Sequence, residues 1–385
     1  MRRIVRLSLF AVVATIVVFG SLWTFRGQAL RFMGISFDTG VAAESDILTP
    51  PGFAVGVFAS GLAGPRFMAV GPDGALFVAE RGADRVVALP DRDGDGQADE
   101  TSVVGGGYDD AHSLAFTASG SLLVAGSGTL YELEVDDSLR EAGRREILTY
   151  PRGGAHSTRT VVVAPDGSLL LSVGSSCNVC WEPDPERASI LAAPADGGSS
   201  RVLMRGLRNA VGMAIDPTTG VPWATNNGRD LMGDDVPPET VYRVVDGADA
   251  GWPRCHAGNI PDPELGDDPD PVTGEVGCDG VVPPDATFQA HAAPLGIAFW
   301  RDHAVIAFHG SWNRSTKVGY EVRWLPWDDG PAGPATVLAG GFLDPDSGDA
   351  TGRPAGVTVG ADGALYVSDD KGGFIYRIVA AADEP

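Results

Sequence analysis

Histidine and arginine residues recur at one kind of position in this chain, directly before segments that are predicted to be strands. His156 follows a Gly-Gly pair and lies three residues before Arg159. A neutral histidine can accept a proton in catalysis, and arginine binds carboxylates through paired hydrogen bonds. The residues that share this kind of position are Arg66, His112, His156 with Arg159, Arg208 with Asn209, His309 with Arg314, and Arg353.

This set of basic residues predicts a site for an anion. Arginines that meet at one place repel one another unless negative charge lies among them, and a polycarboxylate is a natural partner for such a group. A loop salt bridge explains any one of these residues taken alone. Their recurrence at equivalent positions favours a common site at which these side chains converge.

Six related hairpins carry these residues. Each has an apolar strand with alternating pattern, a turn, and a second apolar strand that ends in small or polar residues, which is typical of a β-hairpin. Their starts are separated by 46, 48, 51, 84 and 60 residues, and the first three intervals fit a four-stranded propeller blade. The sequence therefore predicts an all-β fold, a six-bladed β-propeller, with a pair of β-sandwiches as the less favoured alternative. The hairpins begin at Pro65, Ala111, Arg159, Ala210, Pro294 and Pro354.

The propeller is expected to cover residues 45–385. The long fourth interval implies an insertion, which residues 229–291 supply. Strands predicted at residues 52–62 and 373–379 lie at the two ends of the domain, and we expect them to share a blade and close the ring. Residues that precede the inner strands of a propeller meet at one mouth of its central channel, so the histidines and arginines should converge there.

Residues 1–44 precede the propeller. Basic residues near the start are followed by an uncharged run from Leu7 to Phe25, the pattern of a secretory signal or a signal anchor. We expect an uncleaved membrane anchor, with a cleaved signal peptide as the alternative. In both cases the propeller is extracytoplasmic, in a periplasm or at the cell surface. The net charge of −23 argues against a nucleic-acid partner.

Two acidic loops are candidate calcium sites. Asp91, Asp93 and Asp95 alternate as in the start of a calcium-binding loop, but the twelfth position is Ser102 instead of Glu. A structural calcium site or a plain acidic hairpin tip both fit this pattern. The second loop, NNGRDLMGDD from Asn226, offers carboxylate and backbone oxygens to a hard cation, and a solvated turn is its alternative.

The four cysteines allow three disulfide pairings. The most local pairing joins Cys177 to Cys180 and Cys255 to Cys278, and it suits an exported chain. A redox role for the CxxC segment is less favoured because the segment follows a β-hairpin and has no basic neighbours. Zinc binding by all four cysteines is also less favoured in an oxidising compartment.

Several motifs together resemble those of the soluble quinoprotein sugar dehydrogenases, and most closely the sorbosone and pyranose dehydrogenase branch. The resemblance covers about residues 50–380, and it rests on the order and blade positions of the motifs. They are GGAHSTRT around His156, GLRNAVGMA around Arg208, NNGRDLMGDDVPPE from Asn226, GWP at Gly251, HGSWNR from His309 and GRPAGV from Gly352. The resemblance implies a six-bladed propeller that binds pyrroloquinoline quinone and calcium.

The resemblance also implies roles for single residues. His156 matches the general base of the family, and the backbone carbonyls of Gly228 and Arg229 match those that hold the calcium. His112 lies near a pocket position whose residue type differs between branches, so it receives no role. The residues expected to bind the quinone are Arg208, Asn209, Arg314 and Arg353 by resemblance, with Arg66, Arg159 and His309 from their place at the mouth.

The implied reaction is oxidation of a small sugar or sugar-derived alcohol or aldehyde. Neutral His156 would take the hydroxyl proton while hydride moves to the quinone, whose carbonyl calcium would polarise. No C-x-x-C-H haem motif is present, so a separate electron acceptor is expected. The insertion at residues 229–291 departs from the glucose enzymes, so substrate identity does not transfer. The alternatives are a calcium-dependent, lactonase-like hydrolase and a noncatalytic binding module.

Overall fold

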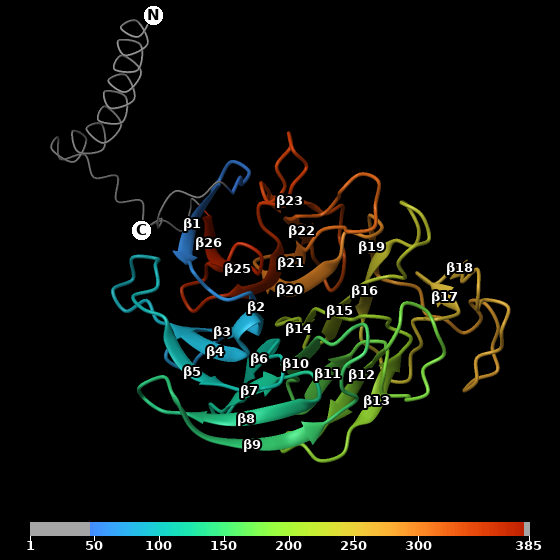
Figure 1. The fold of residues 1–385 in the computed structure, drawn as a ribbon, viewed down its shortest axis with the longest axis horizontal. Helices are drawn as coiled ribbons and strands as arrows, with labels where there is room; N and C mark the ends of the chain where they lie inside the picture. Colours follow the sequence, from blue (N-terminus) through green and yellow to red (C-terminus); the bar gives the residue numbers. More distant parts are fainter. Residues whose placement is uncertain (1–46, 381–385) are drawn as a thin grey trace, which may run out of the picture. The chain divides into compact units, whose positions relative to one another are not determined.

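The computed structural model describes residues 47–380, and the predicted anchor or signal at residues 1–44 lies outside this range. The described chain forms six four-stranded antiparallel sheets and one two-stranded sheet. The larger sheets surround a common centre as the blades of a propeller (Figure 1). The predicted six-bladed, all-β fold is therefore confirmed. Within residues 47–380, no helix has the length and hydropathy that crossing a membrane requires.

The first three blades follow one another along the chain, and the first strand of each lies innermost. Blade 1 contains β2 (Pro65–Val70), β3 (Leu76–Glu80), β4 (Arg85–Leu89) and β5 (Ser102–Gly106), with the short 3-10 helix η1 (Arg81–Ala83) between β3 and β4. Blade 2 contains β6 (Ser113–Phe116), β7 (Leu122–Ala125), β8 (Thr129–Val135) and β9 (Glu141–Thr149). Blade 3 contains β10 (Arg159–Val163), β11 (Leu169–Val173), β12 (Ser189–Ala193) and β13 (Arg201–Arg205).

The last three blades complete the ring. Blade 4 contains β14 (Met213–Ile215), β15 (Pro222–Asn226), β16 (Glu239–Arg243) and β19 (Ala286–Phe288). Blade 5 contains β20 (Pro294–Trp300), β21 (His303–Phe308), β22 (Glu321–Pro326) and β23 (Thr336–Ala339). Blade 6 contains β24 (Pro354–Val359), β25 (Leu365–Asp369), β26 (Phe374–Ala380) and, as its outer strand, β1 (Phe53–Ala59). The two ends of the domain therefore share a blade, as the sequence predicted.

The segment expected to be an insertion, residues 229–291, includes the two outer strands of blade 4. Between those strands, residues 244–285 form a lobe with its own small sheet of β17 (Cys255–His256) and β18 (Ile260–Pro261). The lobe is crosslinked by the disulfide Cys255–Cys278, and the second disulfide joins Cys177 to Cys180. Both pairs are those that the sequence favoured, so the local pairing is confirmed.

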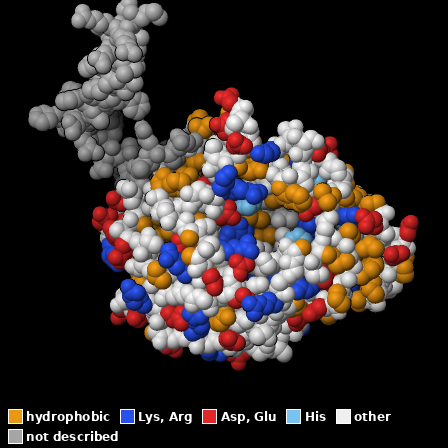
Figure 2. Space-filling model, viewed as in Figure 1, with side chains coloured by type: hydrophobic (Ala, Val, Ile, Leu, Met, Phe, Trp, Pro, Cys, Tyr) orange, Lys and Arg blue, Asp and Glu red, His pale blue; other side chains and the backbone are white. Residues whose placement is uncertain are grey.

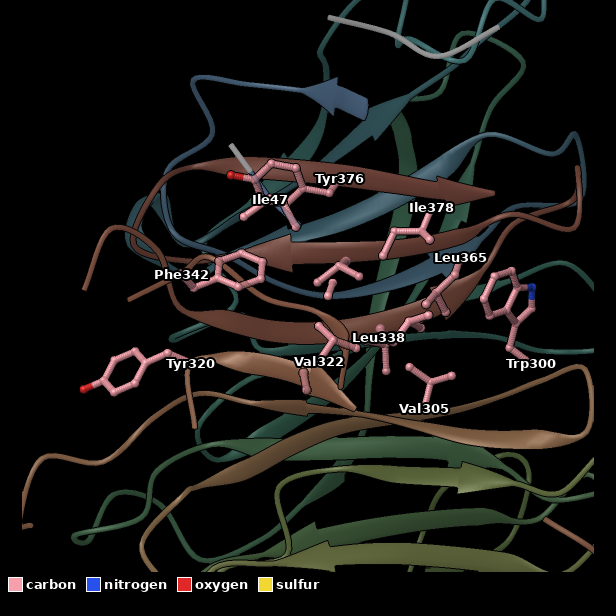
Figure 3. Packing of buried hydrophobic residues seen from close by; sticks show 14 residues of the cluster. Ile47, Trp300, Val305, Tyr320, Val322, Leu338, Phe342, Leu365, Tyr376 and Ile378 are labelled. Atoms are coloured by element: carbon pink, nitrogen blue, oxygen red, sulfur yellow. The ribbon is translucent and has the colours of Figure 1, made fainter. Parts of the chain in front are cut away.

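Apolar side chains pack mainly between neighbouring blades. Figure 3 shows one such cluster, in which Val305 and Val322 of blade 5 face Leu365 and Ile378 of blade 6. Burying a side chain of this size stabilises the fold by about 1.5–3 kcal/mol. Because every strand alternates between its two faces, each blade can pack on both neighbours, and this packing holds the inner strands at fixed places around the centre.

Four buried apolar residues from blades 1, 4, 5 and 6 pack together near the starts of the inner strands, and we call this cluster of Phe67, Val211, Leu295 and Ala355 the plug. The polar residues that precede the inner strands lie on one side of the plug. On the other side lies a cavity of about 420 Å³ whose lining residues are all uncharged. The channel therefore has a polar mouth at the start of the inner strands and an apolar end at their finish.

Candidate active site

The mouth is visible in Figure 2 as a hollow with Lys or Arg and His side chains around it. Three inner strands, β2, β20 and β24, have an irregular register between their first residue and the fourth. Such bulges redirect side chains at a strand end, and Arg66 lies in the first of them. The predicted residues fall into two groups at this mouth, one around His156 and one around Arg66.

His156 lies in the loop before β10, with one ring nitrogen engaged and one open. Its Nδ1 atom lies 2.8 Å from the Ser175 hydroxyl oxygen and 3.2 Å from the Ser175 carbonyl oxygen. The Ser175 hydroxyl donates its only proton to the Cys177 carbonyl oxygen, at 2.7 Å, so both Ser175 oxygens accept from His156. Nδ1 therefore carries the hydrogen, and the lone pair of the imidazole is on Nε2.

Burial and the nearby Arg208 guanidinium lower the pKa of His156 to about 3. The imidazole is therefore uncharged at neutral pH. An uncharged ring with a free Nε2 lone pair is what a general base requires. His156 is thus uncharged, as the sequence predicted, and its tautomer is a finding of the structure; the role itself is a proposal.

Arg159 is fully buried beneath the His156 loop. Its guanidinium donates to the backbone carbonyl oxygens of His156, Thr158, Pro151 and Gly153. These bonds hold the loop in place from below. The structure therefore shows Arg159 occupied by the backbone, where the sequence analysis expected it to contact the cofactor.

Arg66 and His309 meet at Asp370, at the end of blade 6. Arg66 Nη1 donates to Asp370 at 2.5 Å, and His309 Nε2 lies 2.9 and 3.0 Å from the two Asp370 oxygens. Burial lowers the pKa of His309 to about 4, although the carboxylate opposes this shift. The sequence analysis missed Asp370. Asp370 directly follows the second strand of the last hairpin, and the polar residues at that position in each hairpin could have predicted it.

Arg353 extends this second group. Its guanidinium donates to the carbonyl oxygens of His309 and Gly310, at 2.9 and 2.7 Å. Among the described residues, no acceptor is found for Arg66 Nη2 or for Arg353 Nη1. These two arginines therefore retain N–H groups that can bind an anion at the mouth.

His112 is buried between the Phe67 ring and Arg66. The ring centroids of Phe67 and His112 are 4.7 Å apart, and Arg66 Nε donates to His112 Nδ1 at 3.4 Å. Nδ1 is thus an acceptor, and Nε2 carries a hydrogen for which no acceptor is found among the described residues. Burial, with nearby arginines, holds the pKa of His112 well below its usual range. A buried donor without a partner is costly and points to a missing acceptor.

Arg208 is only 3% exposed, and all of its donors are used inside the protein. It donates to Asn178, to the carbonyl oxygens of Asn227 and Gly228, and to Asp230. Asn209 lies beside His156, since a side chain at Gly174 would meet both. Arg208 thus fixes the loop behind the mouth in this structure, and Asn209 faces the His156 side of it.

The loop that was expected to hold calcium begins after β15. The Gly228 carbonyl accepts from Arg208, and its N–H donates to the buried carboxylate of Glu239, whose pKa burial raises to about 7. The Arg229 side chain points into the lobe and pairs with Asp262 and Glu264. Two buried side-chain oxygens here, Asn227 Oδ1 and Asn313 Oδ1, find no donor among the described residues.

Arg314 contacts the far part of the loop after β15, and the Asp91 loop lies elsewhere in the fold. Arg314 donates to the carbonyl oxygens of Asp234, Ala290 and Thr316, and so ties the loops of blades 4 and 5 together. The carboxylates of Asp91, Asp93 and Asp95 lie within 4.8 Å of one another. Their loop joins β4 to β5 at the other end of the strands, so any cation there would be remote from the mouth.

The mouth therefore fits an anionic cofactor with an associated cation. Spare donors occur at Arg66, Arg353 and His112, and orphaned acceptors occur at Asn227 and Asn313. The carboxylates of Asp370 and Asp230 are already paired with arginine, and that of Glu239 accepts from the backbone N–H groups of Gly228 and Ala293. A channel ringed by free carboxylates, as a metal-dependent hydrolase of this shape would need, is not what the described residues form.

The fold and the polar mouth define a class, the six-bladed propellers whose channel mouth is built to bind an anionic group. The chain belongs to the TrAA12-like family, whose model matches residues 47–238 and 267–381. This places it among the pyrroloquinoline quinone-dependent sugar dehydrogenases, as the motifs indicated. The assignment is independent of any single motif, because the match spans all six blades.

Individual relatives agree with this assignment. A pyrroloquinoline quinone-dependent sugar dehydrogenase of Hypocrea jecorina is 26% identical over 433 residues, covering 95% of each chain. A pyrroloquinoline quinone-dependent pyranose dehydrogenase of Coprinopsis cinerea is 27% identical, but the match spans only 54% of that relative and 85% of this chain. The holo form of the pyranose dehydrogenase domain from Coprinopsis cinerea has a TM-score of 0.75 at 25% identity, covering 88% of this chain and 98% of that one.

Proposed function

We propose that this chain is a quinoprotein dehydrogenase that oxidises a sugar, or a sugar-derived alcohol or aldehyde, with pyrroloquinoline quinone and calcium bound at the mouth. The observation that carries the proposal is the state of His156, a neutral imidazole whose free Nε2 lies at a mouth with spare arginine donors. Family membership supports the reaction class. The proposal names no particular substrate within that class, because the segment that contains the lobe at residues 244–285 departs from the glucose enzymes.

The chain's own residues divide the work between binding and proton transfer. Arg66 and Arg353 bind the carboxylates of the cofactor, and Asn209 lines it beside His156. Oxygens of the Asn227–Gly228 segment and of Asn313 hold the calcium. When bound, the quinone supplies the hydride acceptor and calcium the positive charge that favours transfer.

His156 Nε2 takes the proton of the substrate hydroxyl as the carbon loses its hydride. Ser175 accepts from Nδ1–H throughout and stabilises the imidazolium that forms. A separate electron acceptor would take up the two electrons that the substrate loses. The two disulfides fit an oxidising, extracytoplasmic location, which we also propose.

The test is a titration of the purified chain with pyrroloquinoline quinone and calcium, read by absorbance and by the melting temperature. We expect saturable binding and, with sugar, reduction of a dye acceptor. His156→Ala should bind the cofactor but lose turnover. Arg353→Ala should weaken binding about tenfold or more, since a hydrogen bond to a charged group contributes about 1.5–3 kcal/mol.

A matched control is Arg201→Ala, which removes an arginine of an exposed ion pair with Asp246. It should leave affinity and turnover unchanged. The proposal is wrong if wild-type protein with calcium shows no saturable binding of the quinone. A noncatalytic binding module would instead bind without turnover of any sugar in the screen.

A further inference from the structure

The CxxC segment has no role in the reaction described so far, yet it contacts both the Ser175 partner of His156 and the Arg208 side chain. Cys177 and Cys180 form a disulfide that encloses only Asn178 and Val179. The segment is held further by Glu182, whose carboxylate accepts from the backbone N–H and the hydroxyl of Ser176. These contacts give a short, crosslinked loop, which we call the disulfide loop (residues 176–182).

On one side, the disulfide loop sets the state of His156. The Cys177 carbonyl oxygen accepts the only proton of the Ser175 hydroxyl. That contact leaves the hydroxyl oxygen to accept from His156 Nδ1, at 2.8 Å. If the Cys177 carbonyl turned away, Ser175 could donate to Nδ1 instead, and the hydrogen would move to Nε2, where it would block the base.

On the other side, Asn178 holds Arg208 and the loop after β15. Its backbone oxygen accepts from Arg208 Nε at 3.0 Å and from Trp252 Nε1 at 3.2 Å. Its side-chain oxygen accepts from Arg208 Nη2 at 2.8 Å and from the Asp230 N–H at 2.9 Å. Its side-chain nitrogen donates to the Asp230 carbonyl at 3.0 Å. Asn178 thus links blade 3, blade 4 and the lobe through its side chain and its backbone oxygen.

We propose that the disulfide loop is a positioning element of the active site, in which Asn178 and the Cys177 carbonyl align Arg208, the Asn227–Asp230 segment and His156. Asn178 is a positioning residue, since it acts through Arg208 and Asp230. The Cys177–Cys180 bond restricts the two residues on which this alignment depends. This inference rests on the proposed function for its consequence, but the geometry can be tested without the cofactor.

The experiment compares Asn178→Ala with Val179→Ala, its neighbour inside the same disulfide. Amide exchange of the cofactor-free full chain is followed in peptides that contain Asp230, whose N–H bonds to Asn178. We expect Asn178→Ala to speed this exchange about tenfold and to weaken cofactor binding about tenfold, as loss of an outer-shell partner typically does. Val179→Ala should change neither quantity.

The tautomer of His156 is examined in the double variant Cys177→Ala, Cys180→Ala, which keeps the Cys255–Cys278 bond. Imidazole ¹⁵N resonances of the cofactor-free protein should show a single Nδ1–H tautomer for His156 in wild type and a mixture in this variant. Its kcat should fall more than its KM rises. A merely structural disulfide would lower the melting temperature without altering the tautomer or the ratio of kcat to KM.

The outcomes separate this inference from the proposed function. If wild type binds the quinone and both Asn178→Ala and the double variant bind it equally well, the inference is overturned. If wild type binds no quinone, the proposed function fails, and the exchange and tautomer measurements alone decide the inference. Unchanged exchange in Asn178→Ala and an unchanged tautomer in the double variant would then overturn it too.

Discussion

Three hydrogen bonds decide which ring nitrogen of His156 carries the hydrogen. Ser175 and Cys177 leave the lone pair of His156 on Nε2, and burial keeps the ring uncharged. A buried neutral histidine has the opposite pH behaviour from a salt-bridged one. Because its pKa lies below that of the unfolded chain, acidification between the two values favours unfolding.

We predict that His156 of the cofactor-free protein stays uncharged at pH 5.5, because burial and Arg208 lower its pKa from 6.5 to about 3. The measurement is an NMR titration of the imidazole, with His156→Ala to assign the signal. Added pyrroloquinoline quinone should raise the pKa, since negative charge favours the imidazolium. A cofactor-free midpoint near 6.5 would contradict the burial that the structure shows.

Residue types at the mouth could be read from the sequence, but their partners could not. Arg66 and Asp370 are 304 positions apart, and only closure of the ring brings them together. For the same reason the sequence did not separate Arg353, which has a spare donor, from Arg208, which is saturated. The position of a residue before a strand predicts that it lies at the mouth. Which of its donors are already used depends on partners in the neighbouring blade, which the sequence does not reveal.

At the scale of elements, the loop before β10 depends on one buried guanidinium. The fully buried Arg159 guanidinium donates to four backbone carbonyl oxygens of this loop, of which only that of Gly153 also accepts from a second arginine, Arg187. Such groups are costly when they lose a charged partner. The loop that carries His156 is therefore tied to the interior by its backbone, although many surface loops lack such bonds.

We predict that Arg159→Met lowers the free energy of unfolding by about 2–4 kcal/mol. The substitution removes the charged donor from the backbone carbonyl oxygens that Arg159 now satisfies. Urea denaturation measures this change. Turnover should fall as well, since the His156 loop loses its support. An equal loss of stability in Arg201→Ala, where both partners of the ion pair are exposed, would contradict this account.

The alternating hairpins predicted the blades well, because strand pairs depend on local pattern and turn residues. The hairpin that starts at Pro65 becomes β2 and β3, and the one at Pro354 becomes β24 and β25. The span at residues 229–291 was harder to read. It contains two strands of blade 4 as well as a lobe, and short strands such as β19 (Ala286–Phe288) have too few residues for a recognisable period.

At the scale of the whole domain, the ring is closed by strands from both ends of the chain. β1 pairs with β26 from Phe53 with Ala380 to Ala59 with Ile375. This pairing joins the first described strand to the last, so blade 6 cannot be complete until both are in place. The mouth therefore also depends on closure of the ring, because Asp370 of blade 6 pairs with Arg66 of blade 1.

The plug of Phe67, Val211, Leu295 and Ala355 has a kinetic consequence. Because this cluster packs across the centre of the ring, the proposed function would have sugar and electron acceptor enter through the same mouth. The oxidised product then has to leave before the acceptor can approach. We therefore expect the two half-reactions to alternate, with parallel lines in double-reciprocal plots of rate against sugar at several acceptor concentrations, whereas intersecting lines would reveal a second route to the cofactor.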